Sequence, residues 1–215
     1  MTYLQLVNKV LTRLREDTVS TVGQSTYSAL IGEFVNDAKE FVENAWDWSA
    51  LRSTITIPTV ASDYTYSLTN AGQFSEVKTV TNDTANAFMH YRDQDWFEKQ
   101  LYINDTVEGV PVNYTYNGID GNGDAQVMVY PIPDGVYSLR FKTVLRTGTL
   151  TEDADTVNIP TLPIVYVATA LATRERGETG GTSAAELFAI ADKSLSDAIA
   201  LDSNRHPEEL IYVAV

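Results

Sequence analysis

The spacing of apolar residues changes twice along this chain of 215 residues. Up to the tryptophan pair Trp46 and Trp48, apolar side chains recur every three or four residues, which is typical of amphipathic helices. From Ile55 to Val144 they alternate with polar residues, as in strands that bury one face. The helical spacing returns from Pro160 to Ala200. This order predicts an α+β protein in which a β region is inserted between two helical regions.

Residues 1–50 are expected to form two helices. The first covers residues 2–17, and Thr2 can cap its N-terminus. The second covers residues 25–47 with Ser25 as its N-cap, and it would be about 35 Å long at 1.5 Å per residue. Apolar and acidic side chains fall on opposite sides of this second helix, and the tryptophan pair at its end predicts packing anchors.

Residues 151–203 are expected to form two further helices. Pro160 and Pro163 suit the first turn of one helix. Thr182 or Ser183 with Glu186 forms a candidate capping box for the other. We expect these helices to join those of residues 1–50 in one helical bundle, followed by an extended tail at residues 204–215.

Residues 51–150 are expected to form a compact antiparallel sandwich or barrel. Short alternating segments are separated by Gly, Asn, Asp and Pro, which is typical of such folds. A short helix capped by an acidic residue is predicted from Asp93 to Leu101. The predicted strands cover residues 54–57, 64–68, 76–80, 87–91, 112–116, 126–130 and 137–144.

The segment from Asp120 to Asp124, Asp-Gly-Asn-Gly-Asp, resembles the start of a calcium loop. An EF-hand loop needs glycine at its sixth position and a bidentate carboxylate at its twelfth, where this chain has Ala125 and Pro131. The flanking segments are also predicted strands rather than helices. We therefore predict a hairpin turn, with weak cation binding as the open alternative.

No recognisable catalytic or cofactor motif occurs in the sequence. It has no cysteine, and its two histidines, His90 and His206, are far apart, which leaves little material for a metal site. Acidic pairs such as Asp93 and Asp95 are expected by number alone in a chain of net charge −14. We predict no enzymatic activity, no cofactor and no metal, and instead a structural role.

Acidic residues outnumber basic ones in every part of the chain. Residues 1–50 carry four basic and seven acidic residues, residues 51–150 carry seven and eleven, and residues 151–215 carry four and eleven. This balance argues against a protein that binds nucleic acid by neutralising phosphates, although acidic walls could surround a duplex without gripping it. We also expect neither a secretory signal nor a membrane span, and production in a cytoplasm.

Three segments together resemble one protein family. They are Ala45-Trp-Asp-Trp-Ser-Ala-Leu-Arg-Ser-Thr-Ile-Thr-Ile57, the run from Val129 to Leu139 followed by Leu150–Asp155, and the helical pair from Pro160 to Ala200. With this order of elements, the chain resembles the head-to-tail adaptors of tailed bacteriophages, of the gatekeeper or tail-tubular-A type. The resemblance implies a homo-oligomeric, twelvefold ring in the virion neck, assembled in the host cytoplasm.

The resemblance also implies partners and contact sites. The portal protein would lie above the ring, the tail or nozzle protein below it, and DNA would pass through its lumen without sequence-specific binding. The apolar C-terminal segment either docks on its own domain or adds to a neighbouring subunit, and we name Ile211, Tyr212 and Val213 as interface residues. Asp153 and Asp155 are candidates for a loop that faces the neighbour or the lumen.

Two alternative functions stay open. The chain could be a tail completion or baseplate component, in which case the β region would contact the tail. It could instead be a carbohydrate-binding or carbohydrate-hydrolysing β module, because it is rich in tyrosine and has acidic pairs. Sugar binding would need several aromatic side chains exposed in one cleft, whereas a scaffold would bury them on strand faces.

Overall fold

The computed structural model describes residues 1–177 and 182–205. Contacts divide the chain into two compact units. We call the first, Met1–Ala50 with Gly148–Val215, the helical unit, and the second, Leu51–Thr147, the β unit. The predicted mixture of terminal helices and intervening strands is confirmed. The predicted tail, residues 204–215, lies outside the described residues from residue 206 onward.

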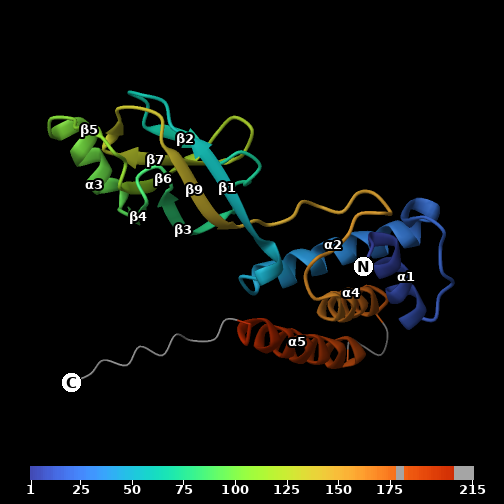
Figure 1. Cartoon of the computed structure of the whole chain (residues 1–215). Coiled ribbons are helices and arrows are strands. Elements are labelled where there is room, and N and C mark those ends of the chain that lie inside the picture. Colours follow the sequence, from blue (N-terminus) through green and yellow to red (C-terminus); the bar gives the residue numbers. More distant parts are fainter. Residues whose placement is uncertain (178–181, 206–215) are drawn as a thin grey trace, which may run out of the picture. The chain divides into compact units, whose positions relative to one another are not determined.

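Four α-helices make up most of the helical unit. α4 contacts α2 and α5 and lies between them (Figure 1), while α1 contacts α2 and α4. No helix in the described ranges combines the length and apolar character needed to cross a membrane. The helices are α1 (Tyr3–Arg13), α2 (Thr26–Asn44), α4 (Thr161–Glu175) and α5 (Thr182–Ser203), with the short 3-10 helices η1 (Val22–Gln24) and η2 (Ser49–Leu51).

Both helix caps predicted in the N-terminal region are confirmed. The Thr2 hydroxyl accepts a hydrogen bond from the backbone N–H of Gln5, and Ser25 accepts one from Ser28. The first helix, however, ends at Arg13 rather than at residue 17. It ends there because Arg15 adopts a left-handed conformation with φ of 59°, which a right-handed helix cannot continue through.

The core of the helical unit is aliphatic apart from the buried Tyr3 and Trp48, and α4 lies at its centre. Small alanines on α4 let the neighbouring helices approach closely, so side chains around most of its circumference are buried. This explains why the sequence of α4 is apolar and lacks a clear polar stripe. The fully buried residues of the helical core include Leu6, Val7, Val10, Ile31, Val35, Ala38, Val42, Ile164, Ala168, Ala170 and Ala172.

The β unit contains one seven-stranded sheet and one two-stranded sheet. The order in the large sheet is β1-β9-β3-β4-β6-β7-β2, and β5 pairs with β8. α3 (Gln94–Glu98) continues directly into a π-helical turn, η3 (Lys99–Ile103), and Asp93 caps α3 as predicted. The strands are β1 (Arg52–Pro58), β2 (Thr65–Ser67), β3 (Glu76–Asn82), β4 (Ala87–Tyr91), β5 (Glu108–Gly109), β6 (Asn113–Ile119), β7 (Ala125–Tyr130), β8 (Ile132–Pro133) and β9 (Ser138–Val144).

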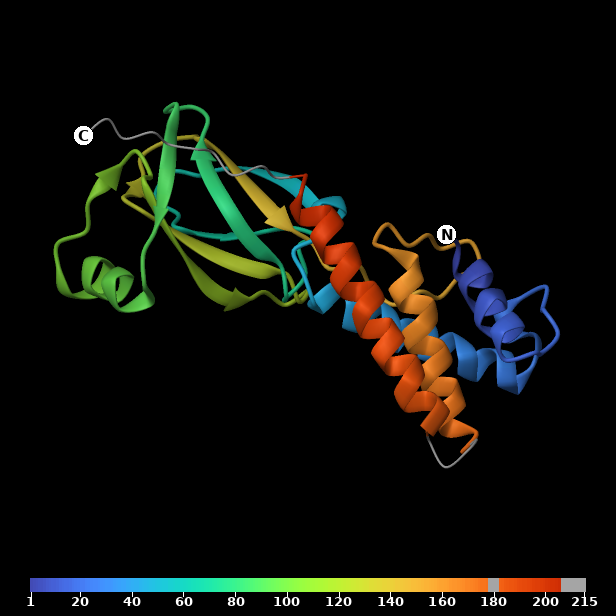
Figure 2. The same ribbon diagram turned by 90° about the horizontal axis from the view of Figure 1, so that it is seen from below.

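The seven-stranded sheet curls until it is nearly closed (Figure 2). Its two edge strands are β1 and β2, yet both contribute to one core. Tyr66 from β2 is part of that core, and Ile55 and Ile57 from β1 pack against it. Curling lets one interior bury apolar side chains from both ends of the sheet, which a flat sheet of this size could not do.

The prediction of a wholly antiparallel β region is wrong at two places. β4 pairs with β6 in parallel, and so does β5 with β8. A parallel pair needs a crossover connection, which here runs from the end of β4 through α3 and η3. The predicted helix near residue 93 is therefore part of the crossover that lets β6 run in the same direction as β4.

Candidate assembly surfaces

The acidic loop that contains Asp153 and Asp155 holds the N-terminal part of the helical unit. The Asp153 carboxylate accepts a hydrogen bond of 2.9 Å from the Val22 backbone N–H. Its carbonyl accepts one of 3.2 Å from Leu4, and the Asp155 carbonyl accepts one of 2.8 Å from Tyr3. These bonds tie the loop to η1 and to the first turn of α1, where backbone N–H groups have no partner within the helix.

The Asp155 side chain is bound within the loop itself. Its carboxylate accepts hydrogen bonds of 2.8 Å from the backbone N–H groups of Thr151 and Glu152. These bonds, chiefly that from Glu152 and then that from Thr151, lower the pKa of Asp155 because they favour its charged form. Both predicted acidic residues thus have partners within their own unit, while the neighbouring Glu152 is exposed.

The other predicted interface residues, Ile211, Tyr212 and Val213, lie outside the described residues. The same is true of His206 and of the side chains in the predicted capping box at residues 182 and 183. The described part of the chain ends at Arg205, two residues after the end of α5.

The predicted packing role of the tryptophan pair is confirmed for Trp48, whereas Trp46 is 36% exposed. An acidic residue that sequence reasoning missed lies beside Trp46. Trp48 is buried and its indole N–H donates to the Val42 carbonyl at 2.8 Å. Trp46 donates at 3.2 Å to Asp202 near the end of α5, and Asp202 also accepts from the Ser49 backbone at 2.9 Å. The signal available in the sequence was an indole N–H that needs a buried acceptor.

The predicted hairpin turn at Asp120–Asp124 is confirmed. The Asp120 carboxylate accepts hydrogen bonds from the backbone N–H groups of Asp124 and Asn122, which lower its pKa. The Asp124 carboxylate accepts from Asn70 and Gly72, each at 2.9 Å. Both carboxylates therefore bind backbone, and within the described ranges no three His, Cys, Asp or Glu residues gather as a metal site would require.

Exposed apolar side chains form a second kind of surface. Leu162 on α4 and Ile190 and Leu201 on α5 line one hollow between these two helices. Their side chains remain about half exposed or more, which is unusual for large aliphatic residues that are this close together. The sequence did not indicate this hollow, because its lining depends on how α4 and α5 pair.

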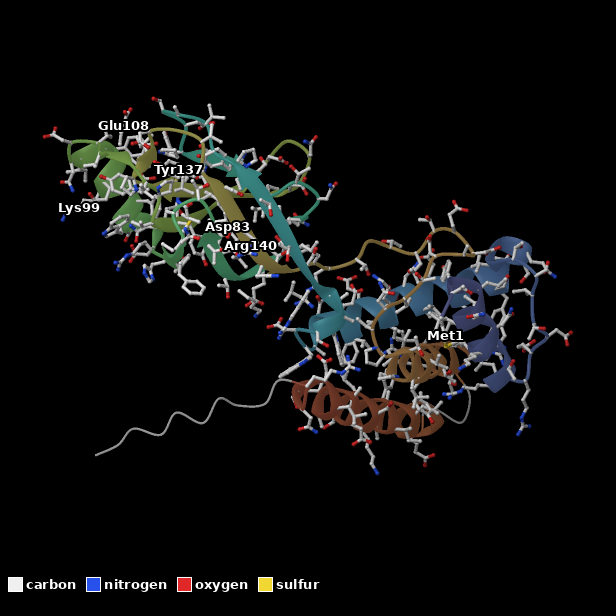
Figure 3. All side chains as sticks on the ribbon, in the orientation of Figure 1. Met1, Asp83, Lys99, Glu108, Tyr137 and Arg140 are labelled. Atoms are coloured by element: carbon white, nitrogen blue, oxygen red, sulfur yellow. The ribbon has the colours of Figure 1, made fainter. Side chains whose placement is uncertain are left out.

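Basic side chains gather on the outer face of β1, β9 and β3. Arg140 and Lys142 on β9 lie near Arg52 on β1 and Lys78 on β3, and we call these four the basic face. Arg140 makes a 2.9 Å ion pair with Asp83, and the two residues are labelled in Figure 3. Strand register brings the four together from distant parts of the sequence, so counting charge along the chain did not find them.

The chain has two units, a basic face, an apolar hollow, and an acidic loop that is hydrogen-bonded to η1 and α1. These features are typical of a structural protein that acts by binding other proteins. The sequence model of the SU10 adaptor protein family matches residues 1–214. The chain therefore belongs to this family of phage head-to-tail adaptors, which confirms the resemblance drawn from the sequence. A comparison with curated proteins found no match. Family membership makes the chain a structural adaptor and a component of a phage virion.

Proposed function

We propose that this protein forms the head-to-tail adaptor ring of a tailed phage. Twelve copies would bind below the portal protein, leave a lumen for DNA, and present a surface on which the tail or nozzle protein assembles. The observation that carries this proposal is the family match, because it extends over residues 1–214 and so includes both units.

The architecture supports a division of labour within each copy. The helices of residues 1–50 and 151–203 would form the rigid bundle of the ring, since α2 and α4 share one core. The β domain of residues 51–150 would be a separate part of each copy, and the tail of residues 204–215 would dock on assembly. A stiff packed core suits a ring that must keep its shape under load.

The charge distribution is consistent with a DNA passage. The helical unit carries eight basic and eighteen acidic residues, a net charge of −10. Acidic walls repel a duplex and keep it mobile within a lumen. The proposed adaptor therefore guides DNA without holding it.

Two segments are proposed as contact sites. Ile211, Tyr212 and Val213 would lock onto a neighbouring subunit or partner, because an apolar end needs burial. The loop of Asp153 and Asp155 would face the neighbour or the lumen, with its shape fixed by the backbone hydrogen bonds of both carboxylates.

The aromatic residues buried on strand faces favour a scaffold over a sugar-binding module, although others, such as Tyr102, are exposed. Tyr66 and Tyr114 are buried in the main core of the β unit, and Tyr130 is buried in a smaller cluster with Phe97. We propose no catalytic activity. A positive glycan-binding or hydrolysis assay would instead support the carbohydrate module.

Electron microscopy of the purified protein, alone and with the portal protein of the same phage, tests the proposal. We expect rings in at least the mixture, seated on one face of the portal. The absence of rings from both preparations would contradict the proposal, and sixfold rings that bind tail components alone would favour a tail completion or baseplate role.

A further inference from the structure

The β unit concentrates its positive charge on three neighbouring strands. β1, β3 and β9 carry four basic residues and one acidic residue, whereas the whole unit carries seven basic and eleven acidic residues. The rest of the unit therefore has three basic and ten acidic residues. Four of the seven basic residues thus lie on three neighbouring strands, and the rest of the unit is acidic on balance.

Alternation along the strands and the register between them place basic and threonine side chains together on this outer face. Along β9, Leu139 and Phe141 point into the core, so Arg140 and Lys142 point outward and are exposed. Lys142 donates to the Thr54 hydroxyl at 2.8 Å, and Arg140 lies within 3.3 Å of the Thr81 hydroxyl. The threonines that flank the two cations across the strands are Thr54, Thr56, Thr79 and Thr81.

The helical unit carries a surface of opposite charge on α2. Glu33, Asp37 and Glu40 are exposed and spaced four and three residues apart, so they lie on one side of the helix. None of them makes an ion pair with any residue that the structure describes. Phe41 lies beside them and is 48% exposed. We call these four residues the α2 stripe.

We propose that the basic face of one copy binds the α2 stripe of a second copy, and that this contact joins neighbouring subunits. The inference rests on the proposed ring. Arg140 and Lys142 are about 7 Å apart along their strand, and one turn of helix separates Glu33 and Asp37 by about 6 Å, so the charges can pair in register. Phe41, one turn beyond Asp37, would pack on the methyl groups of the threonines that flank the cations.

Two different surfaces that bind each other produce a head-to-tail contact. Such a contact, repeated with rotation, generates a closed ring or an open filament, unlike a contact between two identical patches. Like charges at this spacing on α2 also repel one another, and a cationic partner would relieve that repulsion. A second copy supplies that partner.

Nucleic acid is the less suitable partner for the basic face. Proteins that bind duplex DNA through its backbone typically neutralise about 6–10 phosphates. The basic face has four cations, which is fewer than such proteins use.

A charge exchange between two variants of the full chain tests the proposal. The face-reversed variant carries Arg140→Glu and Lys142→Glu, and the stripe-reversed variant carries Glu33→Lys and Asp37→Lys. Sedimentation velocity over a concentration series, alone and with portal protein, measures assembly, and circular dichroism checks folding. Each variant alone should self-associate at least about tenfold more weakly than the unmodified chain, because like charges meet at every contact.

The equimolar mixture of the two variants decides the question. In that mixture the acidic face of one variant meets the basic stripe of the other, and the remaining contact is native, so assembly should return. A matched control with Asp17→Lys and Asp192→Lys makes the same charge change at exposed positions elsewhere in the helical unit and should assemble normally.

Several results would overturn the inference. If folded variants assemble like the unmodified chain, or their mixture fails to assemble, the contact is wrong while the ring proposal stands. If the face-reversed variant loses only duplex binding in a fluorescence anisotropy assay, the basic face is a nucleic-acid surface. If the unmodified chain stays monomeric with and without portal, both the contact and the proposed ring are wrong.

Discussion

At the residue scale, Asp202 accepts hydrogen bonds from the Trp46 indole and the Ser49 backbone while only 7% exposed. Replacing it by alanine leaves both donors without their acceptor in a largely buried site. We expect Asp202→Ala to lower the free energy of unfolding by about 2–3 kcal/mol, measured by urea denaturation. The exposed Asp192 on the same helix provides a control, because Asp192→Ala should change stability by less than about 0.5 kcal/mol.

The pH dependence of stability gives a second test of this site. Burial alone would raise the pKa of Asp202, but hydrogen bonds from Ser49 and Trp46 bring it below its ordinary value. A lowered pKa in the folded state stabilises the protein above the unfolded pKa, and this contribution is lost as the pH falls through the folded pKa. The stability gap between the unmodified chain and Asp202→Asn should therefore be constant near neutral pH and shrink below about pH 4. A gap that widened on acidification would contradict the assignment.

Gly32 marks a close approach between α1 and α2. A Cβ atom there would overlap the Tyr3 hydroxyl and lie 2.9 Å from Val22 Cγ1. In an exposed helix, Gly→Ala stabilises by about 1 kcal/mol, but here we expect Gly32→Ala to destabilise by about 1–3 kcal/mol. Thermal unfolding with and without Tyr3→Phe measures the overlap, since removing the hydroxyl should recover part of the loss. Equal losses in both backgrounds would show that the overlap is unimportant.

At the scale of elements, helix starts were predictable because they depend on local chemistry. Thr2 and Ser25 were identified as caps from their residue type and the apolar spacing that follows them, and both form the expected bonds. The end of α1 was not predictable, because it depends on the left-handed conformation of Arg15, which is not a glycine. The local sequence therefore predicts where α1 begins but not where it ends.

Strand pairing was the less predictable part of the fold. Alternation located β4 and β6, but the parallel direction between them depends on how the intervening helix crosses the sheet. The basic face was missed for the same reason, since Arg52 and Lys142 become neighbours only through the pairing of β1 with β9. For the proposed interface residues, Asp153 shows that an acidic residue in a loop can have a partner far away in sequence.

The buried ion pair on α2 gives a prediction at the element scale. Lys39 and Glu43 are 3.2 Å apart with side chains only 4% exposed, and Lys39 also donates to the Gly148 carbonyl at 2.9 Å. Lys39→Met alone should destabilise by about 3–5 kcal/mol, because it removes the ammonium group 3.2 Å from a buried carboxylate. The double variant Lys39→Met with Glu43→Leu should be substantially more stable than Lys39→Met in urea denaturation. A double variant that is less stable than the single one would contradict this account.

The proposed docking of the C-terminal segment can be tested by truncation. Deleting residues 206–215 removes Ile211, Tyr212 and Val213 and leaves the described elements intact. We expect an unchanged thermal unfolding midpoint but at least about tenfold weaker assembly with neighbouring copies or portal, measured by sedimentation velocity. A control variant with serine at positions 211, 212 and 213 separates loss of apolar contacts from loss of length. If truncation lowers the midpoint without affecting assembly, the segment docks on its own unit.

At the scale of the whole molecule, the two units differ in construction and in charge. The helical unit has a net charge of −10. The β unit has a net charge of −4, and four of its seven basic residues form the basic face. A chain with unlike surfaces is suited to repeated head-to-tail contacts, which can close into a ring. Repeated contacts between copies would suit a phage adaptor, which is the family to which the chain belongs.

The mass of the adaptor assembly bound to its portal, determined by native mass spectrometry, tests this account most directly. The account predicts a complex that contains twelve copies of the 23.8 kDa chain for each portal ring. A complex with a single bound copy, or a chain that stays monomeric beside the portal, would contradict it.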